Sequence, residues 1–223
     1  MSVSLLSLLV LFHILLFVFW LGADLGVAIA GAHFRRRTYS VDQRLAILKL
    51  LVATDMGPRS AWALMVASTI SLVHVAGYWV IPAWGLILAW AISLFWLWLV
   101  WTAHKAGQTP KATKLKKIEM VLKWLLAAFY LGLGILSLVK GAPLLEGWLA
   151  AKALVFGLIF VAAIMIDYRF KPVGPLLMKL IEEGSGGPVE DPLLTTMNKS
   201  RFWVRITYIL LVIVAFLGTT KPF

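Results

Sequence analysis

The sequence predicts an all-α integral membrane protein, a bundle of six helices. Of its 223 residues, 61% are hydrophobic and 14% are charged, and the mean hydropathy is +0.92, whereas soluble domains are about 45–50% apolar and about 25% charged. Residues 60–103 contain no Lys, Arg, Asp or Glu, and a helix needs only about 20 residues to cross about 30 Å of hydrocarbon. That stretch therefore holds two crossings, and the Pro and Gly within residues 80–85 predict the turn between them.

The apolar runs together predict one transmembrane domain over residues 1–223. The predicted crossings lie near 3–33, 58–80, 83–104, 118–139, 147–168 and 203–221. The first run has no basic segment before it and exceeds the roughly 7–15 apolar residues of a signal peptide, so we expect it to remain as the first helix.

Shorter patterns predict what lies between the crossings. Residues 41–53 and 174–183 carry apolar side chains at helical spacing, which is typical of short amphipathic helices in the membrane interface. Asp55 and Arg59 stand four residues apart around Pro58, and this spacing predicts a helix start with a local ion pair.

The basic residues predict the orientation. Segments 34–59, 104–123 and 167–205 hold six Lys or Arg each, which leaves three for the rest of the chain. All three segments fall on one side of a six-helix chain, so the positive-inside rule makes that side cytoplasmic and both termini face outward. We interpret the net charge of +11 as topology signals and lipid head-group contacts, not as a nucleic-acid surface. This arrangement suits a bacterial inner membrane.

The first predicted crossing has a polar face. At about 100° per residue, Trp20 and Asp24 each fall within about 20° of His13. An ionisable group that faces lipid costs several kcal/mol, so this face points into the bundle. On one interpretation, His13 hydrogen-bonds a neighbouring helix and Asp24 pairs with a basic residue. On the other, His13 is an axial haem ligand, and Trp20 and Asp24 line the same cavity, Asp24 as a proton or hydrogen-bond partner.

The remaining histidines and one lysine leave alternatives open. His74 falls at the depth of His13 and is either a second haem ligand or a structural hydrogen-bonding residue. His33 and His104 lie at the cytoplasmic boundary. They are either water-exposed residues of the membrane interface or ligands of a second haem. Lys152 either extends to the outer surface or points inward as a ligand, proton donor or carboxylate partner. With no cysteine in the chain, any haem is held non-covalently.

Three short motifs resemble those of a known membrane family. The first helix has a His followed seven residues later by Trp, with a further His near the helix end; the fifth opens with Gly-Trp-x-x-x-Lys; the sequence ends in Lys-Pro-Phe. The matching residues are His13, Trp20, His33, Gly147, Trp148, Lys152, Lys221, Pro222 and Phe223. The set resembles the small, four-helix, haem-binding membrane protoporphyrinogen IX oxidases of the HemJ type and, more distantly, the copper-resistance D family.

The resemblance covers the first, fourth, fifth and sixth predicted crossings. It implies a haem b bound through His13 and oxidation of a porphyrinogen. The two crossings between, which carry His74 and His104, have no counterpart in the four-helix family. Val204 and Arg205 stand where that family has an Asn-Glu pair.

Three functional hypotheses follow. In the first, the protein is a haem b membrane redox protein with His13 and either His74 or Lys152 at the iron or in a proton relay. Electrons pass from a porphyrinogen-like substrate to a quinone, with Asp24 and Lys152 as the catalytic candidates, while Arg35 and the basic residues beside it bind the haem propionates or an anionic substrate.

In the second hypothesis, His13, His74 and Asp24 form the path of a proton-coupled or copper transporter. In the third, the protein is a non-catalytic scaffold subunit of a membrane assembly. A homodimer is compatible with each of the three, because small membrane bundles often pair.

Overall fold

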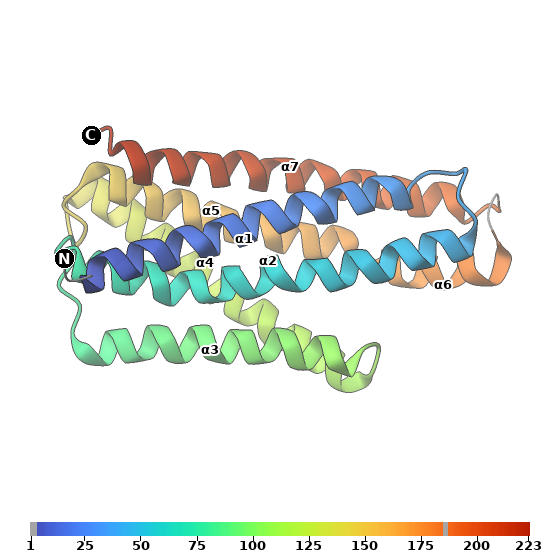
Figure 1. The fold of residues 1–223 in the computed structure, drawn as a ribbon, viewed down its shortest axis with the longest axis horizontal. Coiled ribbons are helices and arrows are strands. Elements are labelled where there is room, and N and C mark those ends of the chain that lie inside the picture. The colour runs from blue at the N-terminus through green and yellow to red at the C-terminus, as the bar shows by residue number, and fades with distance from the viewer. Residues whose placement is uncertain (1–3, 185–186) are drawn as a thin grey trace.

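The computed structural model describes residues 4–184 and 187–223, which form six long helices and one short helix (Figure 1). The helices are α1 (Leu5–Phe34), α2 (Val41–Val75), α3 (Ala83–Ala106), α4 (Pro110–Lys140), α5 (Gly147–Phe170), α6 (Val173–Glu183) and α7 (Glu190–Thr220). The all-helical prediction is confirmed over this part of the chain.

Five helical stretches are long and apolar enough to cross a membrane: α1, α3, α4, α7, and α5 continued by α6. The fifth of these runs over residues 147–183. The membrane-protein prediction is confirmed at this level. A sixth crossing by α2 stays a prediction, because the apolar second half of α2 follows a first half rich in charged residues.

The start of α2 corrects one expectation. Ser40 and Gln43 form a reciprocal capping box, in which each side chain accepts a hydrogen bond from the other residue's backbone N–H. This cap begins the helix at Val41. Residues 41–53 are therefore the first part of a continuous 35-residue helix, and the expectation of a separate short helix there was wrong.

A second expectation on α2 was half right. Arg59 Nε donates to Asp55 Oδ2 at 2.5 Å, so the ion pair is confirmed. The helix start is not, since α2 runs through Pro58 without ending. A proline inside a helix costs one backbone hydrogen bond. Packing of α2 along the length of α1 offsets that loss (Figure 1).

Two other helices begin before the apolar runs that predicted them. α4 starts at Pro110, capped by the Thr109 side chain, and α7 starts at Glu190, with two acidic residues in its first turn. Both features favour a helix N-terminus. Hydropathy identified the apolar parts of these helices and not their polar first turns.

The long helices alternate in direction and place the connecting turns at two ends (Figure 1). We call the end with turns 35–40, 107–109 and 171–172 the basic end, and the end with turns 76–82 and 141–146 and residues 221–223 the terminal end. Helices α1 and α2 pack together, α5 packs between α4 and α7, and α3 packs on α2 and α4.

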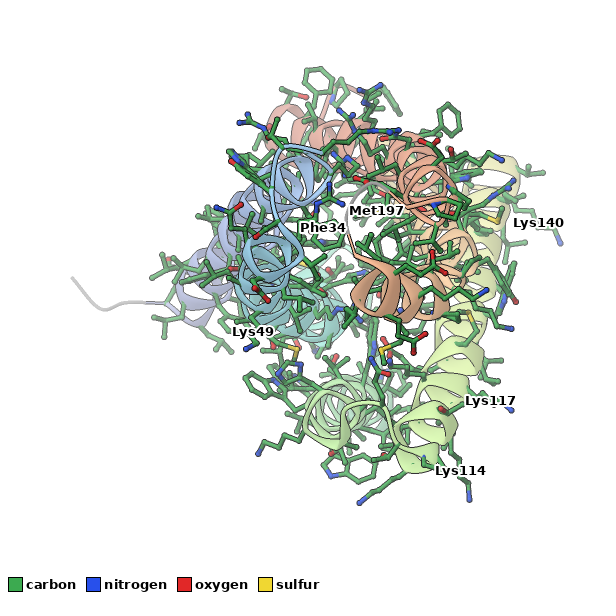
Figure 2. The ribbon with its side chains drawn as sticks, turned by 90° about the vertical axis from the view of Figure 1, so that its right-hand side faces the viewer. Phe34, Lys49, Lys114, Lys117, Lys140 and Met197 are labelled. Carbon is green, nitrogen blue, oxygen red and sulfur yellow. The ribbon has the colours of Figure 1, made fainter. Side chains whose placement is uncertain are left out.

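At the basic end, α6 packs on α7 and closes a small apolar cluster. Val173 and Leu180 of α6 are buried against Phe34 and Met197. Figure 2, seen from this end, shows Phe34 and Met197 between the helices and lysines such as Lys114 at the rim. The short helix predicted at 174–183 thus exists, while its position at a membrane surface stays a prediction.

Six aromatic side chains fill the middle of the bundle. Trp62 lies at their centre, with ring centroids 5.5 Å from Trp20, 4.8 Å from Trp96 and 4.8 Å from Phe160. Tyr130 lies 4.7 Å from Phe156. We call this set the aromatic layer: Trp20, Trp62, Trp96, Tyr130, Phe156 and Phe160.

Candidate functional site

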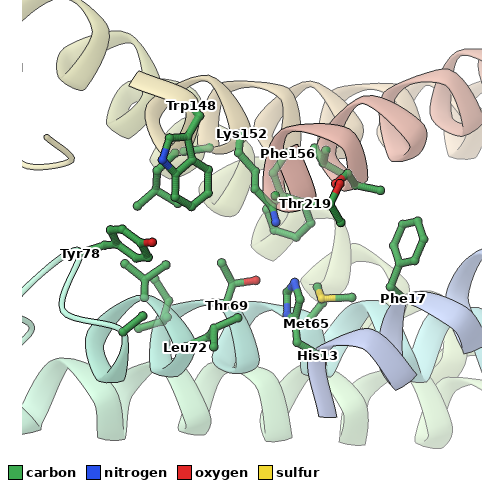
Figure 3. A pocket seen from close by; sticks show the side chains of 18 of the residues that line it. His13, Phe17, Met65, Thr69, Leu72, Tyr78, Trp148, Lys152, Phe156 and Thr219 are labelled. Atoms are coloured by element: carbon green, nitrogen blue, oxygen red, sulfur yellow. The ribbon is translucent and has the colours of Figure 1, made fainter. Parts of the chain in front are cut away.

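A cavity of about 720 Å³ lies between the aromatic layer and the terminal end (Figure 3). Helices α1, α2, α4, α5 and α7 all contribute to its wall, which is mainly aliphatic and aromatic. Trp20, Tyr130 and Phe156 of the aromatic layer line its inner side. Its basic residues are His13, Lys152 and Lys221.

His13 projects into this cavity from α1 (Figure 3). Its Nδ1 lies 3.1 Å from the hydroxyl of Ser68, a fully buried residue of α2. No hydrogen bond engages Nε2 within the described residues. A histidine that binds a metal is oriented in this way, with one ring nitrogen hydrogen-bonded and the other directed at the ligand site.

Lys152 enters the cavity from the opposite wall, so that its amine and the His13 ring point toward one another across it (Figure 3). Gly218 of α7 makes room for the ammonium group, because a Cβ atom at residue 218 would collide with Lys152 Nζ. Over residues 4–184 and 187–223, no carboxylate lies within ion-pair distance of this amine. Of the two orientations left open for Lys152, the structure shows the inward one.

Lys221 completes the cavity at the terminal end. Its Nζ donates to the Tyr78 hydroxyl at 2.9 Å and lies 5.4 Å from the ring centroids of both Tyr78 and Trp148. The Trp148 backbone N–H donates to the Phe223 carbonyl at 3.0 Å. The Gly-Trp-x-x-x-Lys and Lys-Pro-Phe motifs, remote in sequence, therefore lie side by side.

Two other candidates lie outside the cavity. His74 Nδ1 accepts a hydrogen bond at 3.1 Å from the backbone N–H of Ile81, which turns its ring toward the α2–α3 turn. Asp24 lies one turn beyond Trp20, on the far side of that ring from the cavity, and the Tyr208 hydroxyl donates to its backbone carbonyl at 3.0 Å. The structure thus brings together His13, Trp20 and Lys152, but neither His74 nor Asp24.

The candidates at the basic end are also separate from each other. His33 Nδ1 lies 3.0 Å from the Tyr39 hydroxyl, and His104 borders a shallow hollow of about 350 Å³ beside α2. Arg35, expected to bind an anionic group, lies at the basic end, far from the cavity. Partial burial and, to a smaller extent, the nearby Arg201 lower the pKa of the Arg35 guanidinium, which remains protonated at neutral pH.

Beyond the predicted pair of Asp55 and Arg59, the sequence analysis missed a set of buried and partly buried charges on the basic side of the aromatic layer. We call it the ion-pair network: Asp55, Arg59, Glu119, Lys123 and Asp167. Lys123 Nζ lies 3.0 Å from Glu119 Oε1 and 2.9 Å from Asp167 Oδ2. Arg59, paired with Asp55, also interacts electrostatically with Glu119 and Asp167.

A second pair in this network, besides Asp55 and Arg59, also had a sequence signal. Glu119 and Lys123 stand at i and i+4, the spacing of a helical ion pair. Nothing in the sequence indicates that Asp167 of α5 meets them, because that contact depends on how α4 and α5 pack. Trp96 Nε1 donates to Glu119 at 3.2 Å and joins α3 to the network.

A second missed feature joins α1 and α2 to α7 at the basic end. Arg44, fully buried, donates to Glu190 at 2.5 Å and to the Arg36 carbonyl at 2.9 Å. Arg37 pairs with Asp191. These contacts hold the α1–α2 turn against the start of α7.

Within the described residues, no group of three or more His, Cys, Asp or Glu is arranged to hold a metal ion. A haem iron needs only one or two axial protein ligands. The cavity, with its single histidine, is therefore compatible with a haem, whereas a metal ion bound only by protein side chains has no candidate site there.

The fold and the cavity together define a helical protein with stretches long and apolar enough to span a membrane, whose cavity of about 720 Å³ is mainly apolar and is lined by one histidine and two lysines. Comparison of the chain with protein-family models, with curated proteins and with solved structures found no match.

Proposed function

We propose that the protein binds haem b in the cavity through His13 and serves as a redox protein of the membrane. The observation that carries this proposal is the placement of His13, whose Nδ1 is held by Ser68 while the ring projects into a mainly apolar cavity. A neutral imidazole in such surroundings is a common axial ligand of haem iron.

The dimensions and chemistry of the cavity fit this group. Its volume of about 720 Å³ lies within the roughly 300–1,000 Å³ of sites for cofactors and small molecules. Trp20, Phe156 and Trp148 provide flat aromatic walls. The His-Trp and Gly-Trp-x-x-x-Lys motifs, which suggested a haem protein from their resemblance, supply residues to this one space.

The bound haem would supply one-electron redox chemistry. The protein's own residues hold and orient it, with Ser68 fixing the His13 ring and the aromatic layer closing the inner side of the cavity. Lys152 is the residue placed to exchange a proton inside the cavity, since its amine faces His13. We propose a porphyrinogen-like electron donor and a quinone acceptor, both of which reach such a cavity through the membrane.

The proposal includes an orientation. With the basic end in the cytoplasm, as the positive-inside rule requires, the cavity lies in the outer half of the membrane. Six crossings and a bacterial inner membrane complete this topology. The competing transport hypothesis needs a path through His13, His74 and Asp24, and only His13 of these lines the cavity.

A reduced-minus-oxidised absorption spectrum of the protein, purified in detergent from haem-replete cells, tests the proposal. We expect a b-type spectrum that His13→Ala abolishes. His74→Ala is the matched control and should leave the spectrum unchanged, because its ring lies outside the cavity. A colourless wild-type protein, or a full spectrum in His13→Ala, would overturn the proposal.

A further inference from the structure

Two cations line the cavity without a carboxylate to neutralise them. Lys152 is partly buried under the terminal end, and Lys221 lies at the rim. They lie close enough to repel one another, and the described residues place no Asp or Glu within ion-pair distance of either. In an apolar setting, like charges held together are costly. An anionic group bound between them would remove that cost.

Elsewhere in the bundle, buried cations have partners. Lys123 and Arg44 each pair with a carboxylate of the same chain, and so does the partly exposed Arg59. The two cavity lysines are also exceptions to the charge distribution, because they are two of only three Lys or Arg outside the basic segments. Their placement is therefore not explained by membrane topology.

The lining residues from α1 and α7 point to a lateral opening of the cavity between these two helices. These two helices diverge toward the terminal end (Figure 1) and form opposite sides of the cavity (Figure 3). On the α1 side, Val10 and Ile14 line the cavity and are 38% and 52% exposed. On the α7 side, the lining includes two small residues, Ala215 and Gly218, beside Leu211, Val214 and Thr219. This opening faces the hydrocarbon wherever α1 and α7 cross a membrane.

We propose that the cavity takes an amphiphilic carboxylic acid from the bilayer through the opening between α1 and α7, and that Lys152 and Lys221 bind its carboxylates. This inference rests on the proposed function, in which the amphiphile is the haem itself and the carboxylates are its propionates. The propionates then point to the terminal end. The expectation that Arg35 binds them has no support in the geometry, because Arg35 lies at the opposite end.

The carboxylate contacts are tested by titrating haem-depleted protein in detergent with haem b and with haem b dimethyl ester, followed by the Soret band. We expect the free acid to bind at least about tenfold more tightly than the ester, since hydrogen bonds to charged groups are strong. The double variant, Lys152→Gln together with Lys221→Gln, should abolish this preference for the free acid over the ester. Lys140→Gln, an exposed lysine at the same end that does not line the cavity, should preserve it.

Each outcome of this titration is decisive. Equal binding of acid and ester by the wild type, or a preference that survives in the double variant, overturns the inference and leaves the proposed function standing. If neither porphyrin binds, the proposed function fails and the inference fails with it. A changed ligand-field spectrum in Lys152→Gln alone would make Lys152 an axial ligand and would contradict its role as a propionate partner.

The access route is tested by narrowing the opening. Ala215→Trp should slow haem uptake from preloaded phosphatidylcholine vesicles by about tenfold or more, with little change in equilibrium affinity. Val212→Trp, on the outer surface of α7 and away from the cavity, is the matched control. Unchanged uptake in Ala215→Trp would overturn the lateral route.

Discussion

The cavity and the ion-pair network lie on opposite sides of the aromatic layer and differ in whether their charged side chains have partners of opposite sign. In the network, every charge has a partner of opposite sign within the chain: Lys123 lies between Glu119 and Asp167, and Arg59 pairs with Asp55. In the cavity, two lysines and a histidine face an apolar space, and the described residues offer the lysines no carboxylate.

This difference separates a structural role from a binding role. The network joins α2, α4 and α5, so its charges stabilise the packing of the bundle and need no ligand. The two cavity lysines have no carboxylate partner among the described residues, which is the arrangement of a site completed by a bound group. Substitutions in the network should therefore affect stability, and substitutions in the cavity should affect binding.

The largest effect is expected at the centre of the network. Lys123→Met leaves Glu119 and Asp167 without their common cation, and breaking a buried pair costs about 3–5 kcal/mol. Thermal unfolding in detergent measures this loss. The triple variant Glu119→Gln, Lys123→Met and Asp167→Asn removes the charges together and should recover most of it. A loss below about 1 kcal/mol in Lys123→Met would show that the network is not structural.

A smaller loss is expected where α4 and α5 approach closely, a contact that positions both regions. A Cβ atom at Gly134 would lie 2.5 Å from the backbone nitrogen of Leu154. Gly134→Ala should therefore destabilise the protein by about 1–3 kcal/mol. At Gly132, a Cβ atom meets nothing within 4 Å, so Gly132→Ala should be neutral or stabilising. Equal unfolding midpoints for the two variants would contradict the close approach.

Tyr208→Phe should cost less, about 0.5–1.5 kcal/mol. It removes the hydrogen bond to the Asp24 carbonyl that joins α1 and α7 on the network side of the layer. Because the cavity lies on the other side, we expect an unchanged haem spectrum together with a slightly lower unfolding midpoint. Tyr168→Phe, at an exposed tyrosine, is the control. If the protein binds haem as proposed, loss of the haem spectrum in Tyr208→Phe would show that the cavity and the network side are coupled.

The smallest change in stability is expected from Ser68→Ala, which frees Nδ1 of His13. The expected effect is on binding: a haem affinity lower by about tenfold, since groups that orient a metal ligand typically contribute 10–100-fold. Soret titration measures it, and Ser68→Thr should restore the affinity because it keeps the hydroxyl. Wild-type affinity in Ser68→Ala would mean that the hydrogen bond does not orient the ring.

The apolar runs predicted the long helices because membrane-spanning segments need long stretches without charge. The start of α5 at Gly147 agrees with the prediction, whereas α4 and α7 begin earlier because capped, polar turns extend them beyond the apolar part. The continuity of α2 through Pro58 could not be predicted, since it depends on packing against α1.

For the site, helical periodicity correctly placed His13 and Trp20 on one face. It could not show that the Trp20 ring closes the cavity and leaves Asp24 beyond it. The approach of Lys152 to His13, and of Lys123 to Asp167, depends on the relative positions of separate helices. A single sequence contains no direct signal for such contacts.

The aromatic layer has a consequence for the membrane itself. Within the layer, Trp62 Nε1 and the Tyr130 hydroxyl are buried and have no hydrogen-bond partner in the described part of the chain, so neither side chain passes a hydrogen bond across it. A bundle with ionisable groups in both halves would otherwise give protons a stepwise leak down an electrochemical gradient, which stores about 2.3 kcal/mol per charge at 100 mV. The six packed rings of the aromatic layer separate the ionisable groups of the two halves and so oppose proton transfer between them. With the lateral access proposed above, the cavity would exchange its contents with the lipid while these rings separate it from the charges of the ion-pair network.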